Sequence, residues 1–215
     1  MVTAASRSLA DQVARLLDEV GDGLAPVVVA GDPVLRAVAA PYDGQLDTET
    51  LTALVALMRR TMHDAPGVGL AAPQIGLSLA LAVVEDPGLG HRDLAAARER
   101  EVLPFRVLVN PRCAPAGDQR VGFYEGCLSV PGYAAVVHRF RQVRLTAADE
   151  HARPVDEVLT GWPARIVQHE TDHLMGTLYL DRAEPRSLAS AGWGGHWAVE
   201  SVPRTAAAEL GFELP

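Results

Sequence analysis

The sequence IVQHETDHLMG, residues Ile166–Gly176, places two histidines four residues apart, with a glutamate directly after the first. Pro163 suits the first turn of a helix, and Gly176 suits the position after its end. The segment PARIVQHETDHLM is therefore predicted to form one short helix. Whether this helix belongs to a catalytic site depends on the side chains that it carries.

His169 and His173 lie one turn apart on the predicted helix, so both imidazoles project from one face and can bind one metal ion. Glu170 is one position round from the first histidine, where a carboxylate reaches a water at the ion's open position without being a ligand. The pattern H-E-x-x-H is typical of metal-dependent hydrolases. It also arises by chance on amphipathic helices whose histidines face solvent, so a third ligand has to separate the two interpretations.

A third ligand does not follow obviously after the helix. Metalloproteases that extend the motif place a histidine where this chain has Tyr179, and Glu184, beside a proline and close behind the helix, is a poor position for a ligand. Cys127 is the better candidate because it lies in YEGCLSVPG, between a predicted strand and a turn. One thiolate and two imidazoles leave a fourth position open, as a catalytic site requires. A lone cysteine is more commonly a small buried hydrophobe, which is the role expected for Cys113.

The composition indicates a soluble globular protein. Of 215 residues, 48% are hydrophobic and 21% are charged, and a single domain over residues 1–215 is the expectation for that length. The net charge is −8, and the nineteen basic residues are arginines scattered along the chain, which disfavours sequence-specific nucleic-acid binding. Two cysteines fit a reducing compartment, so a cytoplasmic location is expected. The N-terminus lacks the apolar region of a targeting signal, and no run reaches the ~18 apolar residues of a membrane span.

Helical spacing of apolar residues predicts helices over 9–20 and 47–65, the second capped by Asp47. Shorter apolar or alternating runs predict strands within 25–30, 77–84, 105–110, 121–126 and 134–147. The connection over residues 86–104 is polar and punctuated, so we expect it to be exposed. The chain is predicted to be a single-domain α+β protein: short β-sheets packed around a central metal-binding helix, with an N-terminal helical segment.

Three segments together resemble the signature motifs of the peptide deformylase family. They are GVGLAAPQ (Gly67–Gln74), EGCLS (Glu125–Ser129) and QHETDH (Gln168–His173), in the family's order. Each motif alone is moderately specific, but all three in order are not expected by chance. GDPVLR near the N-terminus is also similar to the family's opening segment, so the resemblance runs from about Val27 to Asp181.

The resemblance implies a bacterial-type enzyme that removes the formyl group from the N-terminal formylmethionine of new polypeptides and releases formate. The family's metal ligands fall on Cys127, His169 and His173, and its catalytic glutamate falls on Glu170. Its donors to the tetrahedral oxyanion fall on the side-chain amide of Gln74 and the backbone N–H of Leu128. An amide suits this role because it donates without a charge that would retain formate.

The motif glycines Gly67, Gly69 and Gly126 let the backbone approach a substrate closely. With Val68 they are the expected substrate-binding residues, beside which an extended peptide can add as a strand. Ordinary turn glycines would explain any one of these positions but not their clustering in the motifs.

Ligand softness alone favours zinc, whereas the resemblance implies ferrous iron as the physiological ion, with nickel or cobalt as active substitutes. We follow the family and expect Fe²⁺. The expected partners are N-formylmethionyl nascent peptides, and the tail after Ser187 is expected to pack on the domain, with contact to the ribosome as the alternative. Asp172 is expected either to pair with Arg139 behind the ligands or to be an exposed helical aspartate.

Two other classes of protein stay open from the sequence. A zinc endopeptidase would share the predicted helix but has no use for a loop that carries glutamine and a ligand that is cysteine. A non-catalytic metal protein would need a fourth protein ligand, for which His138 and His151 are available.

Overall fold

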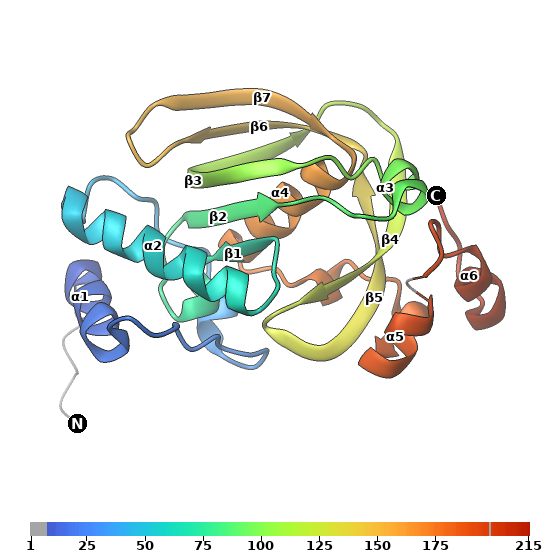
Figure 1. The fold of residues 1–215 in the computed structure, drawn as a ribbon, viewed down its shortest axis with the longest axis horizontal. Helices are drawn as coiled ribbons and strands as arrows, with labels where there is room; N and C mark the ends of the chain where they lie inside the picture. Colours follow the sequence, from blue (N-terminus) through green and yellow to red (C-terminus); the bar gives the residue numbers. More distant parts are fainter. Residues whose placement is uncertain (1–7, 198) are drawn as a thin grey trace.

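The computed structural model describes residues 8–197 and 199–215, so the first seven residues of the expected N-terminal segment lie outside it (Figure 1). The helices are α1 (Leu9–Val20), α2 (Thr48–Asp64), α3 (Arg92–Ala97), α4 (Gly161–Leu174), α5 (Ala191–Trp197) and α6 (Arg204–Leu210). Short 3₁₀ turns are η1 (Pro33–Arg36), η2 (Ala72–Ile75), η3 (Tyr179–Asp181) and η4 (Pro185–Ser187). The strands are β1 (Gly69–Ala71), β2 (Leu81–Asp86), β3 (Leu103–Pro115), β4 (Arg120–Cys127), β5 (Val130–Phe140), β6 (Gln142–Ala148), β7 (Pro154–Thr160) and β8 (Ala189–Ser190).

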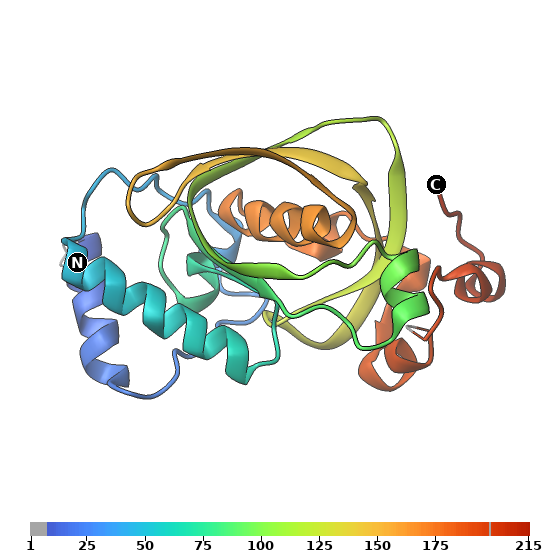
Figure 2. The same cartoon turned by 45° about the horizontal axis from the view of Figure 1, so that its top comes forward.

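Two antiparallel sheets enclose the helix that carries the H-E-x-x-H motif. One sheet has the order β1-β2-β3-β6-β7 and the other the order β4-β5-β8. Figures 1 and 2 show α4 between them, surrounded by strands, while α1 and α2 lie together at one end of the molecule and α5 and α6 at the other. This arrangement confirms the predicted α+β fold with short sheets around a central helix.

Helix α4 is held at the centre by an apolar face and by the glycine that follows it. Ile166, Val167 and Leu174 are buried against side chains of the five-stranded sheet. Gly176 has φ +71°, and a Cβ there would lie 2.6 Å from the carbonyl oxygen of Arg36. Only glycine combines this conformation with so close a neighbour, so the sequence that ends the helix also fixes its position against η1.

The two N-terminal helices form where the apolar spacing predicts them. In α2 the side chain of Asp47 accepts a hydrogen bond from the backbone N–H of Thr50 at 2.7 Å, as expected for an N-cap. Val13 of α1 is buried with Leu54 and Met58 of α2 in one apolar cluster. These helices cover one end of the fold.

The strand predicted within residues 25–30 is wrong. The segment is extended but joins no sheet: the N–H of Val28 donates to the carbonyl of Gln74 at 2.9 Å, and the N–H of Ala30 donates to the carbonyl of Ser129 at 2.7 Å. The segment thus bridges two loops that belong to different motifs. Ala25 is buried and Val28 packs against the cluster that contains Val130, whereas Val29 is exposed.

The run 134–147, predicted to be strand, is divided between the two sheets. It breaks at Arg141, so β5 belongs to the three-stranded sheet and β6 to the five-stranded sheet. The N–H of Arg141 donates to the carbonyl of Gln119, and its guanidinium pairs with Glu99, with Nε 2.6 Å from Oε2. β5 is buried on both faces over Ala135–Val137, whereas β6 has one buried face. Both patterns are typical of strands, so the sequence does not reveal the break.

The connection 86–104 is more structured than expected. It contains α3, and Arg100 near its end pairs with the buried carboxylate of Asp86, with Nε 2.8 Å from Oδ2 and Nη2 3.0 Å from Oδ1. A buried carboxylate requires such a partner. The prediction of a merely exposed connection is therefore wrong at this end of the segment.

The C-terminal tail packs on the outer face of the three-stranded sheet. Trp197, Ala206 and Phe212 are buried there with Tyr124 of β4 and Val136 of β5. The tail therefore supports the strands whose other face holds the motif residues, as expected for a packed tail. No helix in the described part of the chain is long and apolar enough to span a membrane.

Candidate active site and metal centre

Three potential ligand atoms converge beside α4. The rings of His169 and His173 are 5.0 Å apart between centroids, and Cys127, at the end of β4, has its Sγ 3.2 Å from Nε2 of His173. One donor atom from each residue lies within 4.8 Å of the others. An ion 2.0–2.3 Å from each of three such donors fits this spacing. The residues present therefore fit a metal ion with one position left open.

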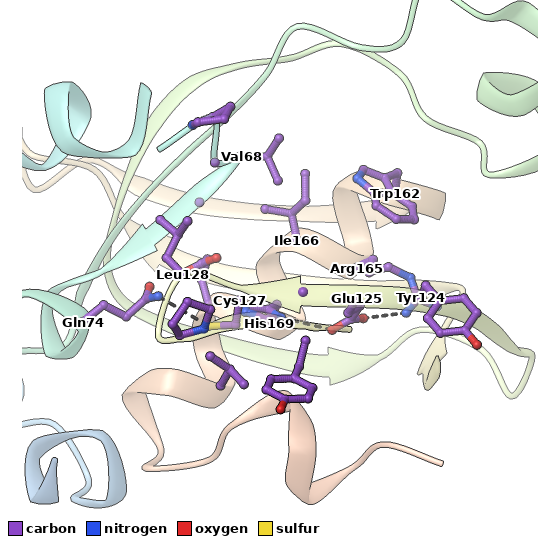
Figure 3. A pocket seen from close by; sticks show the side chains of 18 of the residues that line it. Val68, Gln74, Tyr124, Glu125, Cys127, Leu128, Trp162, Arg165, Ile166 and His169 are labelled. Carbon is purple, nitrogen blue, oxygen red and sulfur yellow. Dashed lines mark hydrogen bonds and ion pairs between the residues drawn. The ribbon is translucent and has the colours of Figure 1, made fainter. Parts of the chain in front are cut away.

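Glu125, two residues before Cys127, orients the first histidine. Its Oε2 is 3.0 Å from Nδ1 of His169, which leaves Nε2 for the ion (Figure 3). Burial alone would raise the pKa of Glu125, but the guanidinium groups of Arg139 and Arg165 hold it well below its usual range. Nε of Arg139 lies 2.6 Å and Nη1 of Arg165 lies 2.5 Å from Oε1. Glu125 belongs to the EGCLS motif, but the sequence predicts no role for it.

A chain of ion pairs continues behind the ligands. Arg139 also contacts Asp172, with Nη1 2.8 Å from Oδ2, and Arg182 closes on the same carboxylate with two contacts of 2.9 Å. Asp172 is buried, so of the two expectations for this residue the pair with Arg139 is present. The network links α4 to β5 and holds the helix in one position relative to Glu125.

His173 is buried, and burial lowers its pKa well below the usual value. A neutral imidazole is the form that binds a metal ion. Its Nδ1 has no hydrogen-bond partner among the described residues, whereas Nε2 faces Cys127. Nε2 is therefore the candidate ligand atom of His173.

Glu170 lines the cavity beside the ligands without being one of the three donors. Burial raises its pKa to about 7, the range in which a carboxyl group both accepts and returns a proton near neutrality. Its Oε2 has no partner in the described part of the chain. A Cβ at Gly69 would overlap this carboxylate, so the glycine of the first motif makes the space that the glutamate occupies.

Gln74 is buried on η2, and its amide is oriented by the neighbouring backbone. Oε1 accepts from the N–H of Ala71 at 2.9 Å, which turns the Nε2 donors toward Cys127 (3.6 Å to Sγ) and Ser129 (3.4 Å to Oγ). Figure 3 shows Gln74 and Leu128 on the same side of the pocket as Cys127. The amide of Gln74, from the first motif, thus lies beside Cys127, from the second.

A cavity of about 540 Å³ opens over this group. Its lining includes Gly67, Val68 and Gly69 on one side and Gly126 and Leu128 on the other. Within the described sheets β1 pairs only with β2, and β4 only with β5, so each presents an unpaired edge. An extended peptide can be held between two such edges by backbone hydrogen bonds.

The remaining candidate ligands lie elsewhere. Cys113 is partly buried on the other side of α4, where its thiol contacts the carbonyl of Val167 at 3.7 Å and Oγ1 of Thr171 at 3.4 Å. Burial raises its pKa, which fits the expected packing role. Neither His138 nor His151 joins the group that could hold an ion, in the part of the chain that the structure describes.

Comparison with known proteins agrees with this geometry. The profile of the polypeptide deformylase family matches residues 24–188. The chain is 60% identical over 208 residues to peptide deformylase 1 of Streptomyces coelicolor, covering 96% of this chain and 94% of the relative, and 52% identical over 190 residues to a peptide deformylase of Bifidobacterium adolescentis, covering 88% and 87%. A class I type b peptide deformylase from Acinetobacter baumannii with Met-Ala-Ser bound superposes with a TM-score of 0.67 at 34% identity, covering 74% of this chain and 98% of that one. The chain is a member of the peptide deformylase family.

Proposed function

We propose that the protein uses this site to hydrolyse the formamide bond of N-formylmethionyl peptides, giving formate and a free N-terminal amine. The observation that carries the proposal is the convergence of three ligand atoms, the buried Glu170 carboxyl and the Gln74 amide on one cavity between two open strand edges. The activity is that of the family, and the assignment of roles to residues is ours. We treat residues 1–215 as one catalytic domain.

We assign Cys127, His169 and His173 as the metal ligands. An ion held by these three side chains would act as a Lewis acid and would lower the pKa of the attacking water. We propose Fe²⁺ as the physiological ion, with Ni²⁺, Co²⁺ or Zn²⁺ able to replace it, since one thiolate and two imidazoles suit all of these ions.

Glu170 is the proton carrier of the proposed reaction. Its carboxylate takes a proton from the attacking water and, once protonated, returns one to the leaving amine nitrogen. A group with a pKa of about 7 performs both transfers at neutral pH. The absence of a partner for Oε2 within the described residues leaves that atom available for the water.

Gln74 and Leu128 are the proposed donors to the oxygen of the formyl group. As water adds to the formyl carbon, this oxygen gains negative charge, which the Nε2 donors of Gln74 and the N–H of Leu128 stabilise. The hydrogen bond from Ala71 to Oε1 fixes which end of the amide faces the reaction. The donors are therefore oriented before the substrate arrives.

Replacing Gln74 with leucine is expected to lower kcat roughly 10²-fold, the scale seen for the loss of one such donor, with little change in KM. Steady-state kinetics with formyl-Met-Ala-Ser measure both constants. Gln45→Leu, on an exposed turn, is the matched control and should keep the wild-type values. An effect confined to KM would make Gln74 a binding residue only.

The substrate is expected to lie as an added strand along Gly67, Val68 and Gly69 on one side and Gly126 on the other. Such pairing recognises the peptide through its backbone hydrogen bonds and places few constraints on the downstream side chains. This suits an enzyme that acts on many new polypeptides. We place the enzyme in the cytoplasm with its substrates. We also propose the ribosome as a partner, contacted through the C-terminal tail.

The test of the proposed function compares two acyl groups on one peptide. Protein loaded with Ni²⁺, or with Fe²⁺ under anaerobic conditions, is expected to release formate from formyl-Met-Ala-Ser far faster than acetate from acetyl-Met-Ala-Ser. The formyl carbon bears only hydrogen, so the attacking oxygen meets no methyl group. Mass spectrometry of the products shows whether internal peptide bonds remain intact. Internal cleavage without formate would support a zinc peptidase in place of a deformylase.

A further inference from the structure

We propose that Arg100 makes one end of the substrate cavity a hydrogen-bond donor site, through which the enzyme also accepts N-formyl peptides that begin with methionine sulfoxide. The inference rests on the proposed function, because it concerns the part of the same cavity that would hold the side chain of the substrate's first residue. Arg100 belongs to the connection 86–104, which carries none of the three motifs.

The cavity extends away from the ligands toward a group of polar and aromatic residues. Figure 3 shows Gln74, Leu128 and Cys127 toward one end of the pocket and Trp162 and Arg165 toward the other. Arg100 lines the cavity and lies at the Trp162 end, with its Cζ 5.2 Å from the centroid of that ring. Its guanidinium therefore lies toward the end of the cavity away from Gln74 and Leu128, where we place the tip of the bound methionine side chain.

The guanidinium of Arg100 is held by Asp86 through two of its nitrogens, and within the described part of the chain the third is left without an acceptor. Asp86, fully buried, accepts from Nε and Nη2, and the Arg100 side chain retains 15% exposure. Its Nη1 has no acceptor among the residues that the structure describes. A fixed cation that lines a cavity and has a donor to spare favours a ligand atom that accepts hydrogen bonds strongly.

Neighbouring cations strengthen this preference. The guanidinium groups of Arg98 and Arg165 lie 5.4 and 5.8 Å from the centroid of the Trp162 ring. Burial, together with the charges of nearby arginines, lowers the pKa of Arg165 to about 10. Three guanidinium groups thus gather at this end of the cavity, where Asp86 and Glu125 pair with Arg100 and Arg165. A negatively polarised oxygen meets guanidinium donors there.

Methionine and its sulfoxide differ in how strongly the side chain accepts a hydrogen bond from such a donor. A thioether sulfur is a weak acceptor, whereas oxidation makes the side chain polar with a strongly accepting S=O oxygen. A purely apolar pocket would reject the sulfoxide, because its oxygen would be desolvated without a partner. Arg100 supplies that partner. The reaction itself is unchanged: water cleaves the formyl C–N bond, and the sulfoxide remains intact.

The test measures kcat/KM for formate release from formyl-Met(O)-Ala-Ser and from formyl-norleucine-Ala-Ser, whose side chain has the same length but no acceptor. In the wild-type protein the sulfoxide is expected to reach at least about one tenth of the norleucine value. In Arg100→Leu the ratio of sulfoxide to norleucine should fall roughly tenfold, since a hydrogen bond to a charged donor is lost, and the change should lie mainly in KM. Arg100→Lys should retain most of the ratio.

Arg59 offers a matched control. It also pairs with a carboxylate through two contacts, 3.2 and 3.1 Å to Glu85, and lies 4.2 Å from the centroid of the Phe105 ring, but it does not line the cavity. Arg59→Leu should leave the ratio unchanged. Calorimetry with the unformylated peptides Met(O)-Ala-Ser and norleucine-Ala-Ser gives the same ratio as dissociation constants, without turnover.

An unchanged ratio in folded Arg100→Leu overturns the inference. If that variant does not fold, the wild-type ratio decides: a value above about one tenth supports the inference, and a lower value overturns it. Failure of the proposed function is separate, because it would appear as no formate from formyl-Met-Ala-Ser itself.

Discussion

Cys127→Ala, His169→Ala and His173→Ala are each expected to lose stoichiometric metal and, with it, all measurable formate release. A site of three protein ligands cannot lose one donor and keep its affinity, and the described residues hold no second group of three potential ligand side chains. Metal content measured by mass spectrometry on the purified variants, with formate release in parallel, checks both parts. Retention of full metal by any one variant would show that the ligand set is wrong.

The other cysteine provides a matched control for the first of these variants. Cys113→Ala removes a thiol from the opposite side of α4, where it contacts the carbonyl of Val167, and should keep both metal and activity. His151→Ala, at an exposed position, serves the same purpose for the histidines. Circular dichroism of all variants separates loss of the ion from loss of the fold.

Glu170→Gln is expected to keep the metal and to lose activity by about 10²–10⁴-fold, the usual contribution of a general acid–base group. The amide has nearly the same shape, so the packing against Gly69 is preserved, but it cannot accept or return the proton. Single-turnover formate release and metal content are measured on the same sample. Near-normal turnover would remove Glu170 from the mechanism.

Glu49→Gln, in the exposed first turn of α2, is the control for the change from carboxylate to amide and should behave as wild type. Glu170→Ala adds a second comparison. If alanine lost metal while glutamine kept it, the carboxylate would also be needed to maintain the shape of the site.

The local parts of the molecule were predictable from the sequence, because spacing within one helix depends only on residues close in the chain. Helix α4 was predicted from Pro163, Gly176 and the H-E-x-x-H pattern, and α2 from its N-cap and apolar period. Cys127 could not be chosen from local spacing with certainty. Its position beside His173 depends on how β4 is placed against α4, and the family resemblance supplied that information.

Glu125 was missed for the same physical reason. It lies 44 residues from His169 in the sequence, so their contact depends on the fold and not on a local period. One signal was available: residues two apart in a strand point to the same side, so Glu125 should face the same way as Cys127. A carboxylate on the ligand's side of the strand is a natural partner for a metal-binding histidine.

The errors concern segments whose pattern has more than one structural solution. Residues 25–30 are extended because their backbone bridges two loops, and residues 134–147 form strands on both sides of Arg141 although β5 and β6 belong to different sheets. Arg100 was hidden in a charged, punctuated segment, and its partner Asp86 lies 14 residues away. The composition of a segment indicates whether it is buried, but it does not identify the residues that the segment contacts.

The close packing of Gly69 and Glu170 has a consequence for the evolution of the chain. The space that the carboxylate fills is the space that any side chain at position 69 would need, so the two positions cannot drift independently. A glycine-to-alanine change displaces the carboxylate of Glu170, the proposed proton carrier, whatever the new residue's own preference for a strand. Any residue other than glycine at position 69 therefore requires the Glu170 side chain to move from the place it occupies beside the three candidate ligands.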